Sequence, residues 1–314
     1  MTQPLQIVFM GTPEFAVPTL EALHRNGQAI PLVVTQPDRP RGRGRKTAPP
    51  PVKAAAARLG LTVEQPASIR TDDFAATLKS VEPDLFVVVA LGQILNRELL
   101  DIPRLGAINV HASLLPKYRG AAPIQWALIN AEKETGITTM LMDVGLDTGA
   151  ILLSAKTAIT GTDTAQTLHD RLSALGADLL VETIDRLISD TLEPTPQDHD
   201  KASWAPLLKK NDGRIDWRQP AAAIDTFIRG MTPWPGAFTF MGDKRLKIFA
   251  ARPAPLPAPA PPGTVIKCFS DELRVATGGD QALSILELQA ASGKRLATRD
   301  YLIGHPVADG TVLR

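Results

Sequence analysis

Continuous apolar runs limit the fold of this chain more than any other feature. Residues 85–90 (LFVVVA) and 5–10 (LQIVFM) contain a single polar residue between them. Strands with apolar side chains on both sides must be covered on both faces, which is typical of parallel sheets. Helical segments follow or precede such runs, one of them beginning at Pro13 and one alanine-rich over 52–59. This alternation predicts an α/β fold with a doubly wound, mostly parallel, Rossmann-like sheet.

The last third of the chain has a different pattern. Short strand-like runs are separated there by glycine and proline, at 237–240, 246–249, 263–266, 273–276 and 283–286. That spacing predicts a smaller C-terminal β-barrel, OB-like in type. A polar, proline-bearing stretch at 189–205 precedes it. We therefore expect a catalytic domain over 1–189, a linker over 190–207 and a barrel domain over 208–314, with the proline-rich insert 253–262 as an extended surface loop.

Composition excludes several classes of protein. The chain has 314 residues, 44% hydrophobic and 21% charged, which is typical of globular proteins with room for two domains. Cys268 is the only cysteine, so neither an intrachain disulfide nor a cysteine-rich metal site is expected. Neither a signal peptide nor an apolar run of roughly 20 residues is present, so we expect no membrane span and a cytoplasmic location. Gly11 is one glycine where a dinucleotide fingerprint needs three, which argues against a nicotinamide enzyme.

Three polar residues stand at the ends of apolar runs. Asn109 and His111 are two residues apart, so in a strand both side chains lie on one face. Asp147 follows a second apolar run, 137–142, in a glycine-containing turn. Because ligands bind beyond the carboxyl ends of parallel strands, we expect these residues to converge at one edge with Gly11 and with 91–92. An amide that stabilises an oxyanion, beside a histidine held by a carboxylate, suits acyl transfer.

Each of these residues also has a structural explanation. On spacing alone, His111 is as consistent with a core histidine bonded to the backbone as with a functional one. Asn109 could cap the strand end. Asp147 could satisfy its own turn, and Asp143 lies nearer the apolar run.

Several motifs together resemble a known family. The chain contains Asn-x-His-x-Ser-Leu-Leu-Pro from Asn109, Arg-Gly-Ala-Ala-Pro from Arg119, and Asp-x-Gly-Leu-Asp-Thr-Gly from Asp143. Gly-Thr-Pro-Glu-Phe at 11–15 and Pro-Trp-Pro-Gly-Ala at 233–237 extend the match over nearly the whole chain. This set resembles the formyltransferases that use 10-formyltetrahydrofolate.

The resemblance implies roles for particular residues. It implies that Asn109, His111 and Asp147 are catalytic, that 10-formyltetrahydrofolate is the formyl donor, and that no metal takes part. The folate would contact two segments, Leu91, Gly92, Gln93 and Ile94 in the first and Ser113, Leu114, Leu115 and Pro116 in the second. The family pattern has an aromatic residue at the position of Leu91, so the contact there departs from it.

A basic segment narrows the resemblance. Its cationic residues are Arg39, Arg41, Arg43, Arg45 and Lys46, with glycines between the arginines. Such a run is often only a solvated surface loop. By resemblance it reaches the acceptor end of a tRNA, and from Leu208 onward 15 lysines and arginines face 10 acidic residues. We therefore expect a monomer that formylates the α-amino group of methionyl initiator tRNA. An amino sugar nucleotide as acceptor, or a non-catalytic RNA-binding module, are the alternatives.

Overall fold

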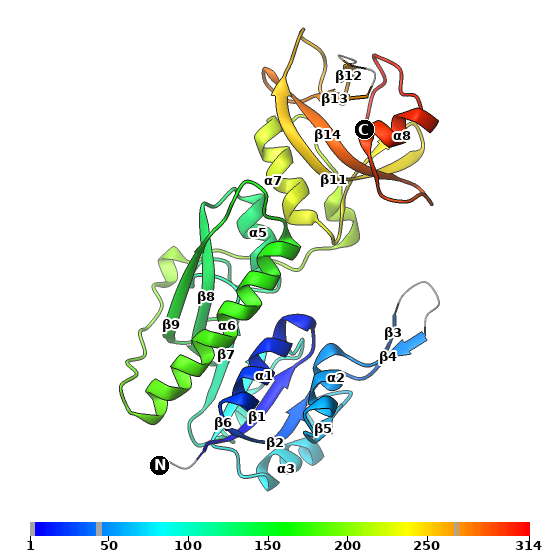
Figure 1. Ribbon diagram of the computed structural model, residues 1–314. Helices are drawn as coiled ribbons and strands as arrows, with labels where there is room; N and C mark the ends of the chain where they lie inside the picture. Colours follow the sequence, from blue (N-terminus) through cyan, green and yellow to red (C-terminus); the bar gives the residue numbers. More distant parts are fainter. Residues whose placement is uncertain (1–3, 42–45, 267–268, 270) are drawn as a thin grey trace. The chain divides into compact units, whose positions relative to one another are not determined.

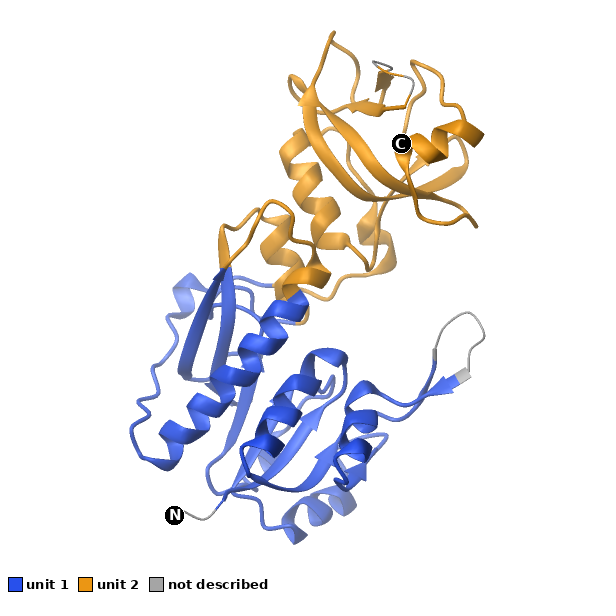
Figure 2. Ribbon diagram, viewed as in Figure 1, with its two compact units in different colours: residues 1–120, 135–157, 169–204 blue, residues 121–134, 158–168, 205–314 orange. Residues whose placement is uncertain are grey.

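The computed structural model describes residues 4–41, 46–266, 269 and 271–314 (Figure 1). The chain divides into two compact units (Figure 2). Unit 1 contains residues 1–120, 135–157 and 169–204, and unit 2 contains 121–134, 158–168 and 205–314. Two segments from the middle of the chain therefore belong to the unit that contains the last third. Whether residues 1–189 fold without the remainder stays a prediction.

Unit 1 is built on a seven-stranded sheet. Its strands are β1 (Gln6–Gly11), β2 (Ala29–Val34), β5 (Val63–Glu64), β6 (Leu85–Val89), β7 (Ala107–His111), β8 (Glu134–Leu141) and β9 (Ile151–Ala158). They lie in the order β5-β2-β1-β6-β7-β8-β9. The first five are parallel, and β8 runs antiparallel to β7. The predicted Rossmann-like, mostly parallel sheet is confirmed.

The register of the parallel strands brings their carboxyl ends together. Gly11 pairs with Val89, and Val88 pairs with Asn109. β6 is buried at every position, as its apolar sequence predicts. Leu91, shortly after β6, and His111, the last residue of β7, therefore lie at the carboxyl ends of neighbouring strands.

Helices cover both faces of this sheet. They are α1 (Val17–Arg25), α2 (Pro51–Arg58), α3 (Asp72–Ser80), α4 (Arg97–Leu100) and α6 (Ala165–Ile188), with a 3-10 turn, η1 (Glu14–Ala16), before α1. The core on one face joins Phe74 and Leu78 of α3, Leu99 of α4 and alternate residues of the strands. On the other face Gly176 of α6 lies against Val110, where an added Cβ would be 3.0 Å from its side chain. Asn109 and His111 alternate with Val110, so they face the side of α3 and α4.

Unit 2 combines helices with a curled antiparallel sheet. Its elements are α5 (Pro123–Ile129), α7 (Ala221–Met231), β10 (Ala237–Met241), β11 (Lys244–Pro255), β12 (Val265–Ile266), β13 (Leu273–Ala276), β14 (Gln281–Ala290), β15 (Leu296–Ala297) and α8 (Thr298–Gly304). The strand order is β10-β11-β14-β13-β12, with β15 beside β14. Ile224 and Ile228 of α7 share one core with Leu246 and Ile248 of β11. The predicted small C-terminal domain of the β-barrel type is confirmed, and its curled sheet forms a half-barrel.

Two segments differ from the sequence prediction. β11 continues into the proline-rich insert, since Pro253 pairs with Leu283 and Pro255 with Gln281. β10 covers β11 only as far as Ile248, so the later residues lie on an open edge where prolines are tolerated. The basic loop contains a short antiparallel ribbon, β3 (Arg39–Arg41) with β4 (Lys46–Ala48).

Candidate active site

His111 is the last residue of β7 and is almost completely buried, with 6% of its surface exposed. Nε2 lies 2.9 Å from the main-chain oxygen of Tyr118. Because a carbonyl oxygen only accepts, Nε2 carries a hydrogen and donates it there. Nδ1 lies 3.7 Å from Oδ2 of Asp147, so a proton on Nδ1 would complete an ion pair.

Asp147 joins the other two polar residues into one cluster. Its Oδ2 accepts the main-chain N–H of Gly120 at 2.8 Å, and Oδ1 lies 3.4 Å from Nδ2 of Asn109. Its φ angle is 54°, in the left-handed region that non-glycine residues seldom adopt. The structure thus brings together Asn109, His111 and Asp147, the three residues singled out in the sequence.

Asp143, the other carboxylate of this loop, has a local role. Its Oδ1 accepts the main-chain N–H of Gly145 at 2.9 Å and the hydroxyl of Thr148 at 2.6 Å. The residue is exposed and closes its own turn. Asp147 is therefore the carboxylate that reaches the histidine.

Asp147 follows the carboxyl end of β8, as predicted, but the expectation that this end lies at the same edge as the carboxyl ends of the parallel strands is wrong. β8 runs antiparallel to β7, pairing His111 with Thr138 and Ile108 with Leu141. The chain therefore leaves β8 beside the amino end of β7. The loop over 142–150 folds back along the sheet face to carry Asp147 to Asn109 and His111.

The predicted folate segment 91–94 follows β6 and is held by side chains that come shortly after β1 and β2. The main-chain oxygen of Leu91 accepts the hydroxyl of Thr12 at 3.0 Å and Nε2 of Gln36 at 2.9 Å. The Leu91 side chain is 2% exposed and belongs to the core around α3 and α4, whereas Gly92 is exposed and Ile94 is 64% exposed. Any ligand contact at Leu91 would thus involve its backbone, while Ile94 offers an apolar side chain.

The predicted segment 113–116 forms a tight turn directly after His111. The Ser113 hydroxyl donates to the Lys117 carbonyl at 2.6 Å, and the Thr138 hydroxyl donates to the Ser113 carbonyl at 2.7 Å. The Leu115–Pro116 peptide is cis. Ser113 and Leu115 are buried, and Leu114 and Pro116 are partly exposed beside the histidine.

Several contributors to the site were not assigned by the sequence. Tyr118 and Gly120 contact His111 and Asp147 through their main chain. The guanidinium of Arg119 donates to the side-chain oxygen of Gln197, whose amide donates to the main-chain oxygen of Asp147. Arg119 belongs to a motif visible in the sequence, but Gln197 lies in the predicted linker and carries no pattern.

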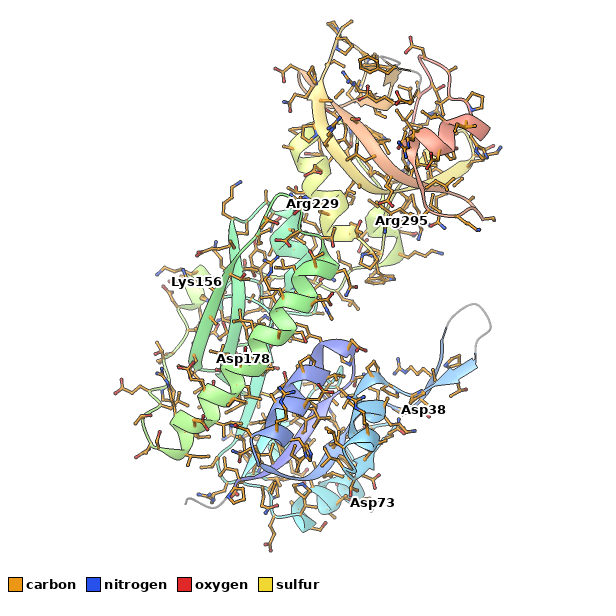
Figure 3. All side chains as sticks on the ribbon, viewed as in Figure 1. Asp38, Asp73, Lys156, Asp178, Arg229 and Arg295 are labelled. Carbon is orange, nitrogen blue, oxygen red and sulfur yellow. The ribbon has the colours of Figure 1, made fainter. Side chains whose placement is uncertain are left out.

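The basic ribbon is anchored at its base. Asp38, labelled in Figure 3, accepts Nζ of Lys53 at 2.8 Å and Nε2 of Gln65 at 2.8 Å. These bonds, with that to Lys53 the stronger cause, lower the pKa of the Asp38 carboxyl. Arg39 is exposed. Arg43 and Arg45 lie outside the described residues, as do the side chains of Arg41 and Lys46.

Among the described residues, no group of three or more histidine, cysteine or acidic side chains is placed to hold a metal ion. Over the same part of the chain, every helix is too short or too polar to cross a membrane.

The sheet thus carries an amide, an imidazole and a carboxylate side by side, and sequence comparison gives the family. Residues 5–184 match the family model described as formyl transferase, and 207–306 match its C-terminal domain. The chain belongs to the formyl transferase family. It is 52% identical over 309 residues to a methionyl-tRNA formyltransferase of Citrifermentans bemidjiense, covering 98% of this chain and 96% of that one. A methionyl-tRNA formyltransferase of Caldanaerobacter subterraneus subsp. tengcongensis is 51% identical over 311 residues, 99% of this chain and 100% of that one.

Solved structures share the fold at much lower identity. An N-formyltransferase from Helicobacter canadensis, in complex with folinic acid and dTDP-3-aminofucose, aligns with a TM-score of 0.67 and 20% identity over 90% of this chain and 98% of that one. HypX from Aquifex aeolicus, in complex with tetrahydrofolic acid, aligns with a TM-score of 0.65 and 16% identity over 96% of this chain and 47% of that one.

Proposed function

We propose that this chain transfers the formyl group of 10-formyltetrahydrofolate to the α-amino group of methionyl initiator tRNA. The observation that carries this proposal is identity of 50% or more to methionyl-tRNA formyltransferases over nearly the whole of both chains. The cluster of Asn109, His111 and Asp147 supports it, because an active formyl transferase needs a donor for an oxyanion and a group that manages the amine proton.

The proposed chemistry is addition followed by elimination. The neutral amine attacks the formyl carbon, the new C–N bond forms, and the formyl oxygen becomes negative in the tetrahedral intermediate. Collapse of the intermediate breaks the bond to N10 of the folate, which takes a proton as it leaves. Overall, the amine loses one proton and the folate nitrogen gains one.

Each cluster residue has a place in this sequence. Asn109 uses one amide hydrogen toward Asp147, and its second amide hydrogen is suited to the developing oxyanion. Protonation of His111 would place a positive charge near the oxyanion, while Nδ1 faces the Asp147 carboxylate and Nε2 donates to the Tyr118 carbonyl. Asp147 orients the imidazole and accepts the amine proton through a water.

The donor would bind against the two segments beside the histidine, 91–94 and 113–116. Ile94 supplies exposed apolar surface for a flat ring, and the exposed backbone at Gly92 supplies polar groups. Hydrogen bonds from Gln36 and Thr138 hold the two segments in place, which would limit the ordering needed when the donor binds.

The acceptor would be held by cationic residues. We infer that Arg39, Arg41, Arg43, Arg45 and Lys46 meet the acceptor arm, because guanidinium groups suit phosphates and stacked bases. The predicted domain over 208–314, with its excess of basic residues, would hold more of the tRNA. We further propose a monomer that works in the cytoplasm, and light scattering of the purified chain tests the first of these statements.

The decisive test is a formylation assay with three acceptors and 10-formyltetrahydrofolate as donor. Charged initiator tRNA should be formylated, whereas charged elongator tRNA and an amino sugar nucleotide should not. Formylation of the sugar alone would replace the proposed acceptor. Binding of tRNA without any formyl transfer would favour the RNA-binding module instead.

A further inference from the structure

The chain between α6 and unit 2 contains one buried side chain in an exposed polar stretch. Of residues 191–200, only Gln197 is buried, with 7% of its surface exposed. A buried amide must find partners for its oxygen and its two hydrogens. Its partners show what this stretch does.

Both the oxygen and the nitrogen of the Gln197 side chain have hydrogen-bond partners, and these partners fix the orientation of the amide. Its side-chain oxygen accepts Nε and Nη2 of Arg119 at 3.1 and 2.6 Å. Its nitrogen donates to the main-chain oxygens of Asp147 and Gly149 at 2.9 and 2.8 Å. A guanidinium only donates and carbonyls only accept, so the flipped amide would lose all four bonds.

The residues beside Arg119 contact the same cluster from the other side. Tyr118 accepts Nε2 of His111, and Gly120 donates to the Asp147 carboxylate. The hydrogen bonds form a closed ring that runs from Asp147 through Gln197 and Arg119 to Gly120 and back to Asp147. His111 is joined to this ring at Tyr118.

A second residue of the same stretch fixes this segment. Ser203 accepts the main-chain N–H of Tyr118 with its hydroxyl at 2.9 Å, and that of Arg119 with its carbonyl at 2.8 Å. Arg119 is itself 3% exposed, and its Nη2 also lies 3.1 Å from Nδ1 of His199. Residues 197–203 therefore hold both the 118–120 segment and the Asp147 loop.

The hydrogen bonds from residues 197–203 stabilise a backbone conformation of Asp147 that is otherwise unfavourable. Its left-handed backbone is strained for a non-glycine residue and persists only when the surroundings over-determine it. Asp147 also lies in an irregular loop, so no strand ladder fixes its place. A misplacement of about 1 Å between reacting groups can cost about 100-fold in rate.

We propose that Gln197, aligned by Arg119, is a positioning residue that sets the place of the Asp147 carboxylate against His111. Gln197 touches no reacting atom in this scheme. It acts through the main chain of Asp147 and Gly149. The inference rests on the proposed function for its kinetic consequence, whereas its structural consequence is measurable without any substrate.

The test compares two isosteric variants in the full chain. Gln197→Glu keeps an acceptor for Arg119 but turns a carboxylate oxygen toward two carbonyls. Gln197→Met removes both the donor and the acceptor. Lys201→Ala is the control, because it breaks only the exposed ion pair with Asp198 in the same stretch.

We expect kcat for formylation to fall about 10- to 100-fold in both Gln197 variants, with KM for each substrate changed less than about threefold. Only Gln197→Met should also lower the melting temperature, since it leaves the buried guanidinium of Arg119 short of an acceptor. The effect of Asp147→Asn should shrink in the Gln197→Glu background, because residues in one network are not additive. The control should match the wild type.

Hydrogen exchange of the substrate-free protein gives the independent readout. Amides over 142–150 should exchange at least about tenfold faster in both Gln197 variants and unchanged in Lys201→Ala. Unchanged exchange, or faster exchange with kcat unaltered, would overturn the proposal. A wild-type chain that formylates no tRNA would refute the proposed function, and the exchange result would still decide whether Gln197 braces the loop.

Discussion

Gly120 donates its main-chain N–H to Oδ2 of Asp147 at 2.8 Å, closer than any approach of His111 to that carboxylate. The main chain of Gly120 is therefore the nearer contact of the carboxylate, and the imidazole is the more distant one. The hydrogen bond from Gly120 does not involve His111, so the carboxylate should keep its place when His111 is replaced.

Replacement of His111 by alanine, or of Asp147 by asparagine, should lower kcat by about 100-fold or more. The reason is loss of the imidazole in one case and of the carboxylate that faces it in the other. Folding should persist, as measured by circular dichroism and thermal melting. Asp143→Asn is the matched control, since asparagine still accepts the loop bonds that Asp143 makes. Near-normal turnover in either cluster variant would remove the catalytic assignment.

The basic ribbon should contribute to tRNA use and little to stability. Replacing Arg41, Arg43, Arg45 and Lys46 with serine or glutamine should raise KM for charged tRNA far more than KM for the folate. Each lost phosphate contact should reduce the slope of log affinity against log salt by roughly 0.7. Exposed ion pairs contribute only about 0–1 kcal/mol, so the melting temperature should hold.

The control for the ribbon replaces Lys79 and Arg97, two exposed cations on α3 and α4. It lowers the net charge without touching the ribbon. Equal salt slopes in the wild type and the ribbon variant, with unchanged affinity for tRNA, would mean that the ribbon is only a solvated surface.

Gly92→Ala should impair use of the folate donor more than it impairs folding. Gly92 has φ 77° and Gly27 has φ 74°, so alanine at either position costs about 1–2 kcal/mol of backbone strain. A Cβ at Gly92 would also overlap Nε2 of Gln36, which holds the Leu91 carbonyl, whereas a Cβ at Gly27 meets nothing. Thermal melting should therefore fall similarly in both variants, and KM for the donor should rise only in Gly92→Ala. An equal rise in KM for the donor in Gly27→Ala would contradict a specific role of the 91–94 segment in donor binding.

Acid should weaken the sheet through Asp84. Its carboxylate accepts the main-chain N–H of Gln6 and the guanidinium of Arg104, which lower its pKa from 3.8. Because the folded pKa is the lower one, the stabilisation is complete above the unfolded value and is lost as pH falls through the folded one. Asp84→Asn should cost about 1 kcal/mol at pH 7, and the difference from wild type should shrink below about pH 3.8. Urea unfolding at several pH values measures this, with Glu82→Gln as the charge control.

The sequence predicts much of this molecule because some patterns have one structural solution. Residues 85–89 have apolar side chains on both sides, so they had to form a doubly covered strand. Asn109 and His111 share a face because strands alternate. The direction of β8 could not be predicted from the sequence, because its threonines and apolar residues are buried on both sides whichever way the strand runs.

Gln197 escaped prediction for a related reason. In a polar stretch, a single buried amide looks like its exposed neighbours, and only its partners in space distinguish it. The stretch reads as a linker by composition, although part of it packs against the site residues.

The contact between Arg119 and Gln197 also determines when, during synthesis of the chain, the Asp147 loop can be held in place. All strands of the large sheet have left the ribosome once Ala158 has emerged, and N-terminal parts of a chain can begin to fold while the rest is being made. The partner of Arg119 comes only after the whole of α6, and Ser203 comes later still. A nascent chain halted before Gln197 would therefore hold His111 in its finished strand while the carboxylate that faces it still lacked its support. The support of the Asp147 loop would come with the last few residues before 205 rather than with completion of the sheet.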